Sequence, residues 1–230
     1  MRVLAIETAT SVCAAAVVNE GAVISEASLN ERYVHAEKLM TQVDAVLEQA
    51  GLVLNQLDGI AVSIGPGSFT GLRIGLSVAK GLAYAAGLHI IPVPTLQALA
   101  QRVVDAQVVL PGERILAALD ARRDEVYAEF FGVKDGYAES LGKPSDVSVA
   151  TLMNDLSAGT VVVTGDARSK LQPAPKREGF QWKFVADDLA RCSAGSVGLL
   201  GVSLMARGEV VGAATLEPLY IKEFFFRQHS

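Results

Sequence analysis

Cysteine is scarce in this chain, and the two cysteines present do not form a recognisable ligand set. Cys13 lies inside an apolar, strand-like run and Cys192 beside a helix-like one, with no CxxC pair and no Cys/His spacing around them. Histidine is scarce too, and His35, His89 and His229 do not share a helical face with an acid at metal-ligand spacing. We therefore expect two buried free thiols and no metal site.

Positive charge is also in deficit, with 20 Lys and Arg residues against 25 Asp and Glu residues and a net charge of −5. Holding a nucleic acid over a broad face requires clustered Lys and Arg side chains that neutralise phosphates. Any contact between this chain and RNA should therefore come largely through a partner protein.

Long uninterrupted hydrophobic runs are missing as well. The longest apolar-leaning stretch, residues 72–88, contains Arg73, Lys80 and several glycines, which makes it a poor membrane span and favours a buried helix. At the N-terminus, Glu7 interrupts the chain before a signal-peptide hydrophobic region is complete, and no small-residue cleavage site follows. The sequence thus predicts a cytoplasmic protein with no membrane segment.

Hydrophobic residues make up 50% of the 230 residues, and they are spread over many short runs. This length allows one large domain or two small ones, at about 100 to 200 residues per domain. Three β-rich runs separated by turn residues predict an antiparallel meander at the start of the chain. Alternating helices and strands follow, which indicates a mixed sheet covered by helices, an α/β arrangement. The predicted strands are 3–6, 12–18, 21–29, 59–64 and 88–93, and the predicted helices are 35–50, 72–86 and 95–104.

The second half of the sequence begins with an echo of the first. Residues 117–120 (AALD) line up with residues 4–7 (LAIE), and in both places an apolar strand ends in an acid, turns and re-enters a strand. The match is short, so a chance pair of hairpins and a duplicated fold both remain open, and duplication is the reading it favours. We place the first domain at 1–105 and a smaller second domain at 106–230, whose tail could return to the first.

A glycine-rich turn follows the predicted strand 59–64 and opens the next helix. Glycines permit positive φ and close backbone approach, and the exposed N–H groups of a helix start favour an anion. The alternative is a tight helix-entry turn capped by Ser68, because the segment is neither a P-loop nor a GxGxxG fingerprint. The candidate anion turn comprises Gly65, Gly67, Ser68, Thr70, Gly71 and Arg73.

Two further motifs leave alternatives open, and no residue is assigned a catalytic role. Residues 120–125 (DARRDE) could present paired carboxylates for acid/base chemistry, although the interleaved Arg122 and Arg123 favour a salt-linked hairpin turn. Residues 224–226 (FFF) could anchor a partner or fold back onto the core. Ser68 lacks the GxSxG elbow pattern, and no local motif supports a Ser-His-Asp or Cys-His arrangement.

Four segments together resemble the TsaB (YeaZ) family over nearly the whole chain. They are GPGSFTGLRIGLSVAKG at 65–81, LDARRDEVYAEFF at 119–131, LAIETATSVCAAAVV at 4–18 and EPLYIKE at 217–223. The resemblance implies two RNase H-like halves of the actin, sugar kinase and Hsp70-type ATPase superfamily, with the second half reduced. It also implies a role: binding the related catalytic subunit TsaD, which with the ATPase TsaE transfers threonylcarbamoyl from an adenylate to the tRNA adenosine beside the anticodon.

The sequence departs from the working enzymes of that superfamily at two places. Kinase-like members carry Asp-x-Gly-Thr in the first β-turn, whereas this chain reads Glu7-Thr8-Ala9-Thr10, so that a side chain occupies the phosphate approach. TsaD holds its metal with a His-x-x-x-His pair, whereas here His35 is followed by Leu39. We therefore expect a scaffold subunit without a cofactor, which binds ATP weakly or not at all. An independent ATPase or kinase and a metallopeptidase-like enzyme are the alternatives.

By the same resemblance, helices 35–50 and 72–86 should form a four-helix bundle with TsaD. The second helix carries two stripes of small residues, 71/75/79/83 and 77/81/85, which suggests two packed neighbours. Both stripes could instead pack internally, and whether the isolated chain pairs with itself is left open. The predicted contact residues are Leu39, Met40, Val43, Leu47, Gly75, Ala79, Gly81 and Ala85.

Overall fold

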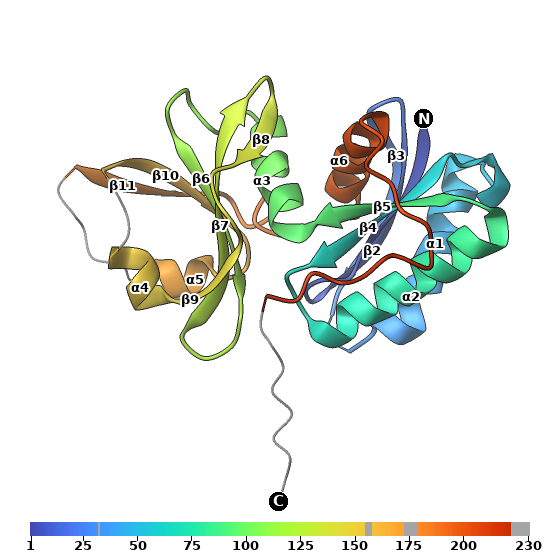
Figure 1. Cartoon of the computed structure of the whole chain (residues 1–230), viewed down its shortest axis with the longest axis horizontal. Helices are drawn as coiled ribbons and strands as arrows, with labels where there is room; N and C mark the ends of the chain where they lie inside the picture. Colours follow the sequence, from blue (N-terminus) through green and yellow to red (C-terminus); the bar gives the residue numbers. More distant parts are fainter. Residues whose placement is uncertain (32, 155–157, 173–178, 222–230) are drawn as a thin grey trace, which may run out of the picture.

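The computed structural model describes residues 1–31, 33–154, 158–172 and 179–221. Figure 1 shows two lobes side by side, each built on its own β-sheet. The first lobe carries strands β1 to β5 and the second carries β6 to β11. None of the helices within these residues is long and apolar enough to cross a membrane.

The sheet of the first lobe has the strand order β3-β2-β1-β4-β5. Its first three strands form the predicted antiparallel meander, whereas β4 and β5 join in parallel. Strands β1 and β2 are almost continuously buried because helices cover both faces of the sheet, and this explains why they read as apolar runs without alternation. The bounds are β1 (Arg2–Glu7), β2 (Val12–Asn19), β3 (Ala22–Asn30), β4 (Gly59–Gly65) and β5 (His89–Pro94).

The sheet of the second lobe repeats this plan in the order β8-β7-β6-β10-β11, with β9 added beside β7. Its strands β6, β7 and β8 are antiparallel and β10 and β11 are parallel additions, as in the first lobe. The acids of the sequence echo, Glu7 and Asp120, end the equivalent strands β1 and β6, which confirms the duplicated fold. The bounds are β6 (Arg114–Asp120), β7 (Glu125–Lys134), β8 (Tyr137–Ser140), β9 (Ser145–Ser148), β10 (Gly159–Thr164) and β11 (Phe180–Phe184).

Two long helices cover one face of the first sheet. Helix α1 (His35–Ala50) and helix α2 (Phe69–Ala86) bury their apolar stripes against β1, β2 and β4. Helix α2 begins earlier than the periodicity predicted, because Ser68 caps it directly. A short 3-10 turn, η1 (Leu54–Gln56), follows α1. In the second lobe the corresponding helices are reduced to α4 (Val149–Asn154) and α5 (Arg168–Leu171).

The lobes exchange their remaining helices across the predicted boundary between residues 105 and 106. Helix α3 (Thr95–Asp105) leaves the first lobe and packs on the second sheet through its buried apolar residues, among them Leu96, Leu99 and Val103. Helix α6 (Ala194–Ala206), which lies within the predicted second domain, packs on the first sheet. The reason is hydrophobic: each sheet has a second apolar face that must be covered.

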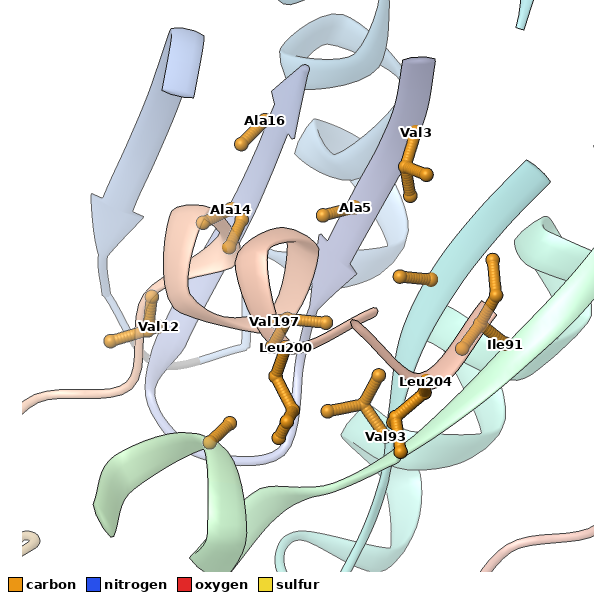
Figure 2. Close-up of a cluster of buried hydrophobic side chains, with 13 residues drawn as sticks. Val3, Ala5, Val12, Ala14, Ala16, Ile91, Val93, Val197, Leu200 and Leu204 are labelled. Carbon is orange, nitrogen blue, oxygen red and sulfur yellow. The ribbon is translucent and has the colours of Figure 1, made fainter. Parts of the chain in front are cut away.

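Figure 2 shows how α6 covers that face. Val197, Leu200 and Leu204 lie against the small residues of β1 and β2 and against Val93 of β5. The glycines that make α6 intrinsically weak allow this close approach, since a Cβ at Gly198 would lie 2.5 Å from Val18 Cγ2 and one at Gly201 2.6 Å from Ala61 Cβ. Tertiary packing therefore stabilises a helix with low propensity.

After α6 the chain returns along the first lobe, as the red segment in Figure 1 shows. Val211 pairs with Ile90 of β5, and the Leu219 N–H donates to the Ile64 carbonyl at 2.8 Å. We call residues 212–221 the strap. The phenylalanines at 224–226 lie outside the described residues.

Candidate functional site

The glycine-rich turn packs against the turn between β1 and β2. Gly67, Gly71 and Gly75 follow one another at intervals of four residues, and a Cβ on any of them would overlap with an atom of Thr8 or Ala9. The Ser68 N–H donates to the Ala9 carbonyl at 2.6 Å, and the Ser68 hydroxyl accepts from the Gly71 N–H at 3.2 Å. These residues therefore form the capped helix-entry turn.

The other members of the candidate anion turn are engaged or exposed elsewhere. The Gly65 N–H donates to Thr95 Oγ1 at 3.1 Å, and Thr70 is exposed. The Arg73 guanidinium lies 3.9 Å from the centre of the Phe69 ring, and its Nε donates to the Tyr220 hydroxyl at 3.2 Å. Arg73 thus fastens the strap to α2, and the backbone donors of Gly65, Ser68 and Gly71 are used inside the chain.

Glu7 is buried at the end of β1, with 1% of its surface exposed. Its Oε1 accepts from the Ala9 N–H at 2.5 Å, whereas Oε2 has no hydrogen-bond partner among the described residues. Burial raises the pKa of Glu7 from 4.5 to about 7, and hydrogen bonding from Ala9, Ser63 and Thr8 offsets only part of that rise. An acid at this position can therefore be neutral in the folded chain at a pH where exposed carboxyls are ionised.

Glu7 lines a shallow recess between the lobes, which we call the interlobe recess. The recess is too shallow to enclose a water-sized sphere, whereas pockets for drug-sized ligands span about 300 to 1,000 Å³. At the neighbouring glycine turn, the Ala9 carbonyl fills the space beside Gly67. The lining residues are Glu7, Thr95, Ala98, Leu99, Arg102, Arg191, Cys192, Ser193 and Ser196.

The DARRDE turn differs from the predicted salt-linked hairpin. Asp120 pairs with Lys170 of α5 at 2.7 Å, and the same ammonium donates to the Arg123 carbonyl at 2.7 Å. The side chains of Arg122 and Arg123 are exposed, and both residues adopt positive φ. A lysine brought from 50 residues along the chain therefore holds this turn, which hairpin spacing could not reveal.

The expectations about metal ligands and thiols have separate outcomes. Within the described residues, Cys13 and Cys192 are free and buried, as predicted. His35 is buried and its Nε2 lies 3.1 Å from the Val12 carbonyl, while Leu39 packs in the core one turn later. No group of three His, Cys, Asp or Glu side chains that could hold a metal ion occurs in the part of the chain that the structure describes.

Burial divides the predicted docking residues into two sets. Leu39, Val43, Gly75 and Ala79 are buried in the lobe's own core, so they are withdrawn from the docking surface. The stripe 71/75/79/83 is the inward face of α2, because it meets the β1–β2 turn and β4. The residues that remain accessible are Met40, Leu47, Gly81 and Ala85.

Sequence reasoning missed the most exposed side chain of this surface. Tyr84 is 87% exposed on α2, next to the open stripe Ser77, Gly81 and Ala85, and a Cβ at Gly81 would meet nothing within 4 Å. Its position one turn after Lys80 and three residues after Gly81 could have placed it on that face. We call Met40, Ser77, Gly81, Tyr84 and Ala85 the helix-pair surface.

Comparisons with known proteins identify the family of this chain. Residues 23–192 match the family described as tRNA N6-adenosine threonylcarbamoyltransferase, TsaD. The tRNA threonylcarbamoyladenosine biosynthesis protein TsaB of Escherichia coli is 33% identical over 228 residues, which cover 96% of this chain and 95% of that protein. TsaB of Haemophilus influenzae is 34% identical over 168 residues, covering 67% of this chain and 69% of that protein.

Solved structures show the same relationship. YeaZ from Pseudomonas aeruginosa matches with a TM-score of 0.83 and 31% identity, over 95% of this chain and 99% of that one. An inorganic polyphosphate/ATP-glucomannokinase from Arthrobacter matches with a TM-score of 0.50 at 10% identity, over 90% of this chain and 99% of that one, and so shows the fold alone. The chain has the two-lobed fold of sugar kinases and belongs to the TsaB (YeaZ) family.

Proposed function

We propose that this chain is a non-catalytic scaffold subunit in the threonylcarbamoylation of tRNA, which binds a TsaD subunit through the helix-pair surface. The observation that carries the proposal is that surface itself. Two adjacent helices present Met40, Tyr84 and a stripe of small residues on the outside of the first lobe, while the opposite stripe of α2 is committed to the core. Small residues let a second helix approach closely, at about 8 to 10 Å between axes.

The closed interlobe recess supports a scaffold role over an independent kinase. A kinase of this fold has to admit phosphate at the first β-turn, whereas here the Ala9 carbonyl accepts from the Ser68 N–H and packs against Gly67. We propose that ATP binds weakly or not at all to the isolated chain. One solved relative is described as similar to a peptidase, but the described residues here offer neither a metal cluster nor a nucleophile motif that favours this activity.

The match to the TsaD family and the net charge of the chain support the proposed partners. We propose that TsaD is the docked protein and that TsaE joins the assembly, with tRNA held mainly by these partners because the net charge here is −5. Two copies of the isolated chain could pair through the same surface. The proposed place of action is the cytoplasm, where tRNA modification occurs.

Gly81→Leu tests the proposal, because it fills the open stripe without touching the chain's own core. We expect the variant to fold and to melt at the same temperature as the unaltered chain or slightly higher, because leucine favours a helix interior more than glycine does. It should lose capture of TsaD in a pull-down. In cells that lack the unaltered protein, it should also fail to restore threonylcarbamoyladenosine in tRNA, as measured by mass spectrometry. Ala206→Leu is the matched control, since Ala206 is exposed at the end of α6 on the opposite face of the sheet. If the Gly81 variant captures TsaD as well as the control does, the docking surface is misassigned.

A further inference from the structure

The interlobe recess lies where the chain crosses between the lobes. It is lined by Thr95, where the chain enters α3 on its way to the second lobe, and by residues 191–193, where the chain comes back to start α6. Arg102 of α3 donates to the Arg191 carbonyl at 2.6 Å and ties the two crossings together. Glu7 belongs to neither crossing, and reaches the recess from the end of β1. Any relative movement of the lobes must therefore shift the walls around Glu7.

The carboxyl group of Glu7 has an unfilled hydrogen-bonding requirement there. Oε1 takes the Ala9 N–H, whereas Oε2 is buried and has no partner among the described residues. A neutral carboxylic acid tolerates such a site far better than a carboxylate, because an ionised oxygen without a partner loses its hydration without compensation. Ionised Glu7 would therefore favour any arrangement that lets water reach Oε2.

The groups that face Glu7 do not supply a compensating cation. From β4, the Ser63 hydroxyl contributes hydrogen bonding, and α6 and its cap contribute the hydroxyls of Ser193 and Ser196. The guanidinium of Arg102 donates to the Arg191 carbonyl, and Arg191 is exposed. Cys192 also lines the recess. Burial and, to a lesser extent, the charges of Glu7 and Asp166 raise its pKa well above the usual value, while Arg102 lowers it slightly. The recess therefore holds two acidic groups, the Glu7 carboxyl and the Cys192 thiol.

We propose that Glu7 is a proton-operated latch between the lobes: protonated Glu7 keeps the two crossings closed over β1, and ionised Glu7 opens them to water. The opening is confined to α3, residues 186–196 and the end of β1, and it leaves the sheets intact. This inference does not depend on the proposed docking of TsaD. It concerns the junction between the lobes and not the outer face of α2.

Hydrogen exchange measured by mass spectrometry at pH 6 and pH 8, corrected for the intrinsic rate at each pH, tests the latch. Peptides covering 95–104 and 188–198 should exchange about tenfold faster at pH 8, the factor that follows from a carboxyl pKa of about 7 when closed and 4.5 when open. A peptide covering 13–18 in β2 should not change. Glu7→Gln, which keeps the shape without the charge, should abolish the difference. An equal rise in that variant, or no rise in the unaltered chain, would falsify the latch.

The two cysteines give a second readout that needs no variant. Cys192 lines the recess and Cys13 lies in the core between the first sheet and α1 and α2. Alkylation of each thiol is followed by mass spectrometry and divided by its rate in the denatured chain at the same pH, which removes the effect of thiolate chemistry. Cys192 alone should become about tenfold more accessible between pH 6 and pH 8. If Cys13 rises in parallel, the opening is global unfolding and the latch is rejected.

Discussion

Glu7 makes the stability of the folded chain depend on pH. Its pKa is about 7 in the folded chain and 4.5 when exposed, so the folded state holds its proton to higher pH than the unfolded state does. The sign follows from linkage: the contribution of Glu7 to the free energy of unfolding is greatest below pH 4.5, falls as pH rises towards 7, and is constant above.

We predict that the free energy of unfolding of the unaltered chain falls by about 2 to 3 kcal/mol relative to that of Glu7→Gln between pH 5 and pH 8. This difference follows because one pKa unit corresponds to about 1.4 kcal/mol. Urea unfolding of both proteins across this range measures the difference, and other titrating groups cancel between them. Parallel stability curves for the two proteins would mean that Glu7 is hydrated in the folded state.

For α2, packing on its two faces decides how each glycine tolerates a side chain. At Gly75 a Cβ would overlap with Thr8 Oγ1, while at Gly81 the space is open. Gly75→Ala should therefore destabilise the chain by about 1 to 3 kcal/mol through overpacking. Gly81→Ala should stabilise it by up to about 1 kcal/mol, because alanine favours a helix interior.

Thermal and urea denaturation of the two variants check this pair, and each serves as the control for the other because both add one methyl group to the same helix. Equal changes in the free energy of unfolding at the two positions would mean that α2 does not pack against the β1–β2 turn. The early start of α2 at Ser68 also positions the strap. It places Phe69 inside the helix, where the Phe69 ring contacts both Tyr220 and the Arg73 guanidinium.

For the whole molecule, the exchange of α3 and α6 makes the lobes interdependent. In a fragment of residues 1–105, the face of the first sheet that carries Val3, Ala5 and Val93 would be exposed because α6 is missing. Helix α3 would likewise have no second sheet to cover. We predict that a fragment of residues 1–105 gives poorly dispersed amide resonances and no cooperative thermal transition.

Joining residues 193–221 to that fragment through a flexible glycine and serine linker should restore a cooperative transition, because it returns α6 and the strap to the first sheet. The comparison also isolates the cause, since both fragments lack the second sheet. Cooperative unfolding of residues 1–105 alone would show that α6 is dispensable for the first lobe.

The sequence by itself determined the local features of this protein and its family. Apolar runs gave the strands, the echo of Glu7 at Asp120 indicated two lobes of one plan, and Ser68 followed by Gly71 predicted the cap. Four long motifs spread over the chain indicate the TsaB family. These features are encoded within a few residues of one another, where spacing and side-chain chemistry suffice.

Only the tertiary structure decided which surfaces meet. The two small-residue stripes of α2 are alike in sequence, and the contact with Thr8 and Ala9 determined that the one containing Gly75 faces inward. Residues far apart in the chain produce the exchange of α3 and α6, the pairing of Asp120 with Lys170 and the burial of Glu7 Oε2. Local patterns fix an element and its faces, but burial and hydration depend on which neighbour the rest of the chain brings to each face.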